Sequence, residues 1–187
     1  MLTAPSQHWR GPGNPQALLV VVGEDFVDDP ITLEAVAHVV GGHEKPADDY
    51  QGGVESIIRL RPDLPLDTLQ GLEEFSHLIV TWRFHLGSDA DLHLGARSPR
   101  NNPEWQPTGT FVHRNHRRPN RMATSFPRLL KVEGRDLHVT DLDAVNGTPI
   151  YDLGPYFEQM GPRGPITAPA WPAVMLEHYW DPAAERP

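Results

Sequence analysis

The chain has 187 residues, of which 39% are hydrophobic and 22% are charged, and its formal net charge is -9. This composition is that of a globular protein of one domain, and the absence of cysteine excludes disulfides, thiolate catalysis and cysteine-bound metals. No apolar run reaches the roughly 20 residues that cross a bilayer, and no signal-peptide pattern opens the chain. We therefore expect a soluble, cytoplasmic protein without a membrane segment.

The first half of the sequence predicts strands separated by turns. Residues 1–30 are expected to form an N-terminal extension with one short apolar segment, Ala17 to Val22. The stretch ITLEAVAHVV, from residue 31 to 40, and the stretch VESIIRLRP, from residue 54 to 62, are rich in β-branched residues and predict two strands. LDTLQGLEEF, with leucines three apart, predicts a short helix. SHLIVTWRFH is the most apolar stretch and predicts a central strand.

The second half begins with a long loop and returns to strands. Residues 87–110 hold turn formers and no sustained period, so we expect a loop, and loops of this length are usually functional or disordered. RLLKVEGRDLHVTDLDAV predicts two strands around Glu133–Arg135, and TPIYDLGPYF predicts one more after Asn146-Gly147. PAWPAVMLEHYWD predicts a short helix near the C-terminus.

These elements predict an all-β fold with minor α content. The count is six or seven short strands, no strand alternates with a long amphipathic helix, and no dinucleotide or phosphate-binding glycine motif is present. We expect a single-sheet β-barrel or strongly curled sheet, antiparallel or mixed. No metal site is expected, because His113 and His116 point to opposite faces if they lie on a strand, and His77 and His85 lie too far apart on one.

Two polar stretches could carry chemistry. Between Arg97 and Lys131 there are eight cations and one acid, Glu104, although the whole chain is acidic. Arginine dominates FVHRNHRRPNR, which favours bidentate binding of carboxylate or phosphate, and Pro119-Asn120 predicts a rigid turn there. The simpler interpretation is a solvated basic loop. In DLDAVNGTPIYD, the aspartates either cap backbone amides or bind a ribose diol or a cation.

Three motifs in order, GLEEFSHLIVTWRFH, FVHRNHRRPN and LLKVEGRDLHVTDLDAVNGTPIYDLGPYF, resemble the TsaA-like family, which contains the TrmO (YaeB) tRNA methyltransferases. The resemblance runs from about residue 31 to 157, with extensions at 1–30 and 158–187, the latter with the short helix. It implies a single-sheet β-barrel that binds S-adenosylmethionine, forms a homodimer and N6-methylates threonylcarbamoyl-adenosine in tRNA.

The resemblance also implies which residues form the site. The positions that match the family's cofactor site are Tyr50, Gln51, His85, Leu86, Arg114, Thr124, Thr140, Asp141, Leu142 and Asp143. Of these, His85 or Asp143 is expected to serve as the catalytic base, and Arg117, Arg118 and Arg121 are expected to contact RNA phosphates.

Some family positions differ in this chain. Gly154 stands where the family has lysine, Asn146 replaces the aspartate of DGTP, and Asp49-Tyr50 replace proline-arginine. Two alternatives therefore stay open: an S-adenosylmethionine-binding regulatory module without catalysis, and a methyltransferase that acts on a substrate other than tRNA.

Overall fold

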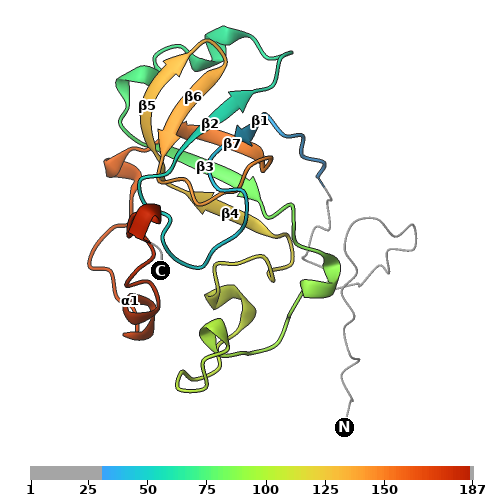
Figure 1. The fold of residues 1–187 in the computed structure, drawn as a ribbon, viewed down its shortest axis with the longest axis vertical. Coiled ribbons are helices and arrows are strands. Elements are labelled where there is room, and N and C mark those ends of the chain that lie inside the picture. The colour runs from blue at the N-terminus through green and yellow to red at the C-terminus, as the bar shows by residue number, and fades with distance from the viewer. Residues whose placement is uncertain (1–30, 186–187) are drawn as a thin grey trace. The chain divides into compact units, whose positions relative to one another are not determined.

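The computed structural model describes residues 31–185, which from Leu33 onward form one compact unit. Seven strands make one sheet in the spatial order β4-β3-β7-β1-β2-β6-β5, and the paired strands are antiparallel (Figure 1). Their bounds are β1 Ala37–Val40, β2 Glu55–Leu60, β3 Leu78–Arg83, β4 Met122–Ser125, β5 Arg128–Glu133, β6 Asp136–Thr140 and β7 Pro149–Pro155. The prediction of an all-β fold on one sheet is confirmed.

The core lies on the inner face of this sheet. Burial alternates strictly along β3, so Leu78, Val80 and Trp82 point inward while the residues between them are only partly buried. Ile58 on β2 and Leu137 on β6 are paired directly and are fully buried. This period of two is what an apolar strand with one buried face requires.

The sheet is strongly curled, and its two edge strands, β4 and β5, follow each other directly in the sequence. Only Phe126 and Pro127 separate β4 from β5, so one nearly continuous segment pairs with β3 at one end and with β6 at the other. His77 bridges to Arg128, and the Leu78 amide donates to the Pro127 carbonyl at 3.0 Å. The sheet is therefore barrel-like, although β4 and β5 themselves form no ladder that would close it.

Several local predictions were wrong. The expected helix in LDTLQGLEEF is two 3-10 turns, η1 Leu66–Leu69 and η2 Leu72–Glu74, since Gly71 between them has a φ of 84° that ends a helix. Of the strand expected over residues 31–40, only the part that forms β1 is present. The strand β4 was not predicted at all, because its sequence MATS carries little apolar alternation.

Elements outside the sheet are short. The long loop contains the 3-10 turns η3 Asp89–Asp91, η4 Pro99–Asn101 and η5 Thr110–Val112, and η6 Glu158–Met160 follows β7. The predicted C-terminal helix exists as α1 Trp171–Met175, followed by η7 Ala183–Glu185. No described helix is long and apolar enough to cross a membrane. The predicted apolar segment Ala17 to Val22 lies outside the described residues.

Candidate functional site

Asp143, three residues after β6, accepts hydrogen bonds on both carboxylate oxygens. Ser125, the last residue of β4, donates to Oδ1, and the Tyr179 hydroxyl donates to Oδ2 at 2.6 Å. Trp82 Nε1 donates in turn to Ser125 Oγ at 2.8 Å, which ties the carboxylate to the buried face of β3. Burial and the charge of Asp143 raise the pKa of Tyr179, so its phenol keeps the proton that it donates.

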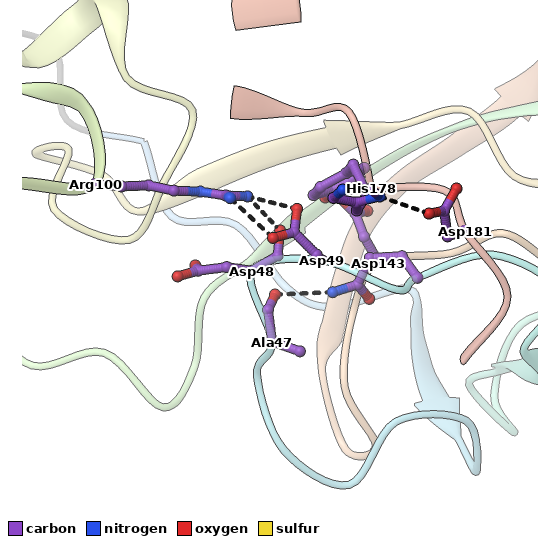
Figure 2. A network of polar contacts seen from close by, with 9 residues as sticks. Ala47, Asp48, Asp49, Arg100, Asp143, His178 and Asp181 are labelled. Carbon is purple, nitrogen blue, oxygen red and sulfur yellow. Dashed lines mark hydrogen bonds and ion pairs between the residues drawn. The ribbon is translucent and has the colours of Figure 1, made fainter. Parts of the chain in front are cut away.

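The loop between β1 and β2 is held from the side by Arg100. Its guanidinium binds both Asp49 oxygens at 2.8 Å and the Asp48 carbonyl at 2.6 Å, as Figure 2 shows. Gln51 follows in this loop, is 3% exposed, and donates from Nε2 to the Ala47 carbonyl at 2.8 Å. A bidentate arginine–carboxylate pair fixes both partners in one plane. The loop is therefore rigid where the predicted residue Gln51 lies.

The C-terminal segment, defined here as residues 178–183, docks on the same loop through backbone hydrogen bonds. The amides of Tyr50, Gln51 and Gly52 donate to the carbonyls of residues 178, 179 and 181 at 2.9, 2.8 and 3.2 Å. A Cβ on Gly52 would lie 2.1 Å from the Trp180 carbonyl oxygen. Only glycine permits this approach of the two backbones.

The segment from Thr140 to Asp143 turns sharply beside the loop. Asp141 has a φ of 61°, and its Oδ1 accepts the Gly53 amide at 2.8 Å and the Thr140 hydroxyl at 3.4 Å. Leu142 points into the core and is 1% exposed. The residues predicted here therefore have different roles. Asp141 caps a backbone amide, Leu142 packs in the core, and Asp143 accepts the hydrogen bonds of the polar network.

Arg114 and Thr124 lie together at the edge of β4. One guanidinium nitrogen of Arg114 donates to the Thr124 carbonyl at 2.6 Å, next to the Ser125 that contacts Asp143. Within residues 31–185, no carboxylate pairs with Arg114, and its side chain is exposed. The rest of this guanidinium faces solvent beside the network.

The three arginines predicted to meet RNA differ in their surroundings. Arg121 is bound to Asp89 at 2.9 Å and to the Gly87 carbonyl at 2.7 Å, and its side chain is 12% exposed. Arg118 donates to the Met122 carbonyl, and burial lowers its pKa. Arg117 has no carboxylate partner in the described part of the chain.

His85 lies at another point of the site, just beyond β3. Its Nδ1 is 3.2 Å from the Thr148 hydroxyl, and its ring is next to Gly147 of the turn before β7. Burial, and secondarily the nearby His38, lower the pKa of His85, so the ring is neutral at neutral pH. Leu86 beside it is 61% exposed.

The structure brings most of the predicted residues together and adds some that the sequence did not indicate. Side-chain hydrogen bonds join Tyr179, Asp143 and Ser125, the Gln51 amide donates to the Tyr179 carbonyl, and the Thr124–Arg114 pair is next to Ser125 in the chain. Tyr179 was missed because PAWPAVMLEHYWD was considered only as a docked helix, and Arg100 was missed because it lies in a loop without periodicity. No signal in a single sequence could have joined them. No cluster of three His, Asp or Glu side chains suited to a metal occurs between residues 31 and 185.

The fold is a curled antiparallel sheet with an arginine-rich loop, and the Asp143 carboxylate beside it accepts two side-chain hydrogen bonds. The sequence matches the family described as the tRNA-methyltransferase O N-terminal domain over residues 45–161, which is more than half of the chain. The chain belongs to this family. The match ends before the C-terminal segment.

Individual relatives agree with this assignment. A tRNA (adenine(37)-N6)-methyltransferase of Mus musculus is 36% identical over 92 residues, which are 49% of this chain and 21% of that protein. A probable S-adenosyl-L-methionine-binding protein of Methanothermobacter thermautotrophicus is 34% identical over 121 residues, 65% of this chain and 83% of that protein. The chain thus spans about a fifth of the mammalian relative and most of the archaeal one.

The fold is also that of a solved structure. TrmO from P. aeruginosa superposes with a TM-score of 0.59 at 20% identity, over 74% of this chain and 60% of that one. This likeness concerns the fold.

Proposed function

We propose that this protein binds S-adenosylmethionine and methylates N6 of an adenine in tRNA, with threonylcarbamoyl-adenosine as the specific substrate. The observation that carries the proposal is the polar network centred on Asp143, a predicted cofactor-site residue within the family match, whose carboxylate accepts hydrogen bonds from Ser125 and Tyr179. The name of the Mus musculus relative supplies the reaction.

The residues present fit the cofactor's polar groups. Arg114 offers free guanidinium donors to an amino-acid carboxylate, since only one of its nitrogens is used by Thr124. Each oxygen of Asp143 keeps a lone pair that can accept a ribose hydroxyl in addition to its present donor. Bound S-adenosylmethionine would supply an electrophilic methyl group on a sulfonium.

The chain's own contribution is orientation and removal of a proton. Methyl transfer from the bound cofactor would form the bond between N6 and the methyl carbon as the carbon–sulfur bond breaks, and a base of this chain would accept the N6 proton. We assign that base to His85, because burial lowers its pKa and keeps the ring neutral, and because Nε2 can accept a proton in the tautomer whose Nδ1–H donates to the Thr148 hydroxyl. Alignment of the reacting atoms provides the larger share of the rate enhancement.

The arginines supply the contact with RNA. Arg117 carries most of it in this proposal, because Arg121 would have to leave Asp89 and Arg118 would have to leave the Met122 carbonyl. Each phosphate that an arginine neutralises steepens the dependence of affinity on salt by about one unit of log–log slope.

Two assays test the proposal. Calorimetric titration should detect binding of S-adenosylmethionine, and Arg114→Ala should weaken that affinity while Arg117→Ala leaves it unchanged.

Methyl incorporation should occur in native tRNA that carries threonylcarbamoyl-adenosine and not in the same tRNA transcribed without modification. In this assay Arg117→Ala should lower the salt slope of tRNA binding by about one. Equal loss of cofactor and tRNA affinity in Arg117→Ala would contradict the division of roles.

A second candidate is a binding module without catalysis. It is favoured by the archaeal relative, which this chain covers for 83% of its length and whose name states only that it probably binds S-adenosyl-L-methionine. Cofactor binding without methyl transfer to total tRNA would select this candidate, and transfer to another acceptor would select a different substrate. The homodimer and the cytoplasmic location stay predictions, the first to be tested by sedimentation against the 20.9 kDa chain mass.

A further inference from the structure

The C-terminal segment completes the site from outside the part of the chain that the family match covers. That match ends at residue 161, yet residues 178–183 form four backbone hydrogen bonds with the loop that contains Gln51. Tyr50 and His178 add stacked rings, 6.1 Å between centroids and 4° between planes. Several contacts thus hold the segment on the loop. Because Gly52 has no Cβ, the Trp180 carbonyl can approach its backbone closely.

This docking delivers one polar side chain into the network. Tyr179 is mostly buried, and its hydroxyl lies 2.6 Å from Asp143 Oδ2. Ser125 donates to the other carboxylate oxygen, so the two donors, one before and one after Asp143 in the sequence, fix the plane of the carboxylate between them. Without Tyr179, the carboxylate could rotate about its Cβ–Cγ bond, because Ser125 alone constrains a single oxygen.

We propose that Tyr179 is a positioning residue that holds the Asp143 carboxylate in the orientation needed to receive a ribose-bearing ligand. In this proposal, the C-terminal segment forms part of the ligand site. The assignment of the ligand rests on the proposed function, whereas the contact between Tyr179 and Asp143 does not.

The first experiment needs no ligand. Urea unfolding is measured for the wild type, Tyr179→Phe, Asp143→Ala and the double variant, with Tyr151→Phe as the matched control. Coupling between the two sites is expected, so that Tyr179→Phe has little effect once Asp143 is alanine. Additive effects in this cycle would overturn the positioning role, whatever the protein binds.

The second experiment measures the affinity for S-adenosylmethionine by calorimetry on the full chain. Tyr179→Phe should weaken it about tenfold, as expected for a hydrogen bond to a charged group, and the Tyr151→Phe control should not change it. Gly52→Ala, whose new methyl group would displace the Trp180 carbonyl, should weaken it at least as much. It should also remove the protection of the Gln51 and Gly52 amides from hydrogen exchange, which Tyr179→Phe should preserve.

The outcomes separate the two proposals. A wild type that binds no S-adenosylmethionine overturns the proposed function, while the unfolding cycle still decides whether Tyr179 and Asp143 are coupled. Tighter binding by Tyr179→Phe would overturn the positioning role, because the tyrosine would then compete with the ligand for Asp143.

Discussion

The sheet and the site around it are stabilised in different ways. The sheet buries Leu78, Val80, Leu137 and Ile150 completely, and its strands are joined by regular ladders. The site is made of loops joined by polar contacts, such as the bidentate pair of Arg100 and Asp49 and the hydrogen bond from Tyr179 to Asp143. The free energy of unfolding should therefore depend mainly on the sheet. Ligand selectivity should depend on the contacts of the site, whose loss changes that free energy little.

The largest expected effect belongs to the sheet. Leu137→Ala removes a side chain with no solvent exposure and should lower the free energy of unfolding by about 2 to 5 kcal/mol, since the cavity adds to the lost transfer energy. Leu130→Ala on β5, where the leucine is 43% exposed, should change it by less than about 0.5 kcal/mol. Chemical denaturation measures both, and similar values would contradict the placement of the core.

A smaller effect is expected where the two regions meet. Trp82→Phe keeps an aromatic ring in the core and removes the hydrogen bond to Ser125, so unfolding should become easier by about 1 to 2 kcal/mol. The matched control is Trp105→Phe in the long loop, with an expected change within about 0.5 kcal/mol. Ligand affinity should fall in Trp82→Phe alone, because Ser125 then loses its anchor.

A still smaller effect is expected for the ion pair of the loop. A double-mutant cycle of Arg100→Gln and Asp49→Asn should give a coupling free energy of about 0.5 to 1 kcal/mol, because both side chains are only partly exposed and the geometry is bidentate. Added salt should reduce the coupling. A coupling that does not respond to 1 M salt would show that the pair is more deeply shielded than its exposure indicates.

The smallest expected effect is the pH dependence of stability, to which His178 and His85 contribute with opposite sign. The hydrogen bond to Asp181 raises the pKa of His178, so its contribution to stability is complete below pH 6.5 and is lost as the pH rises through the folded value. The pKa of His85 is lowered, so its contribution is present above pH 6.5 and is lost as the pH falls through the folded value.

Melting temperatures of the wild type, His85→Gln and His178→Gln between about pH 5 and pH 8 measure this difference. The gap between wild type and His178→Gln should narrow toward high pH, and the gap for His85→Gln should narrow toward low pH. Two gaps that move in the same direction would contradict the assigned surroundings of one histidine.

The sequence predicted the sheet better than the site. The apolar content of SHLIVTWRFH, rich in β-branched and aromatic residues, indicated β3, and Gly134, with a φ of 59°, marked the turn between β5 and β6. Period and turn chemistry are local properties, so they can be recognised in one sequence. The helix in LDTLQGLEEF failed because the conformation of Gly71 overrode the leucine spacing.

The site could be predicted only as separate parts. Family motifs indicated Gln51, Arg114 and Asp143, but none of them indicated that Asp143 would be bound by Ser125 and Tyr179, which are 18 and 36 residues away. Likewise, Arg117 and Arg121 looked equivalent in sequence, and the structure distinguishes them because Arg121 is bound to Asp89 and to the Gly87 carbonyl.

By itself the sequence determined the all-β class, the order along the chain of every strand except β4, and the gathering of arginines in one loop, because these follow from residue type and spacing. The tertiary structure decided how far the sheet curls, which arginines have no carboxylate partner among residues 31–185, and that the C-terminal segment reaches the Asp143 network. Such contacts join residues distant in sequence, and their geometry depends on the packing of every element between them.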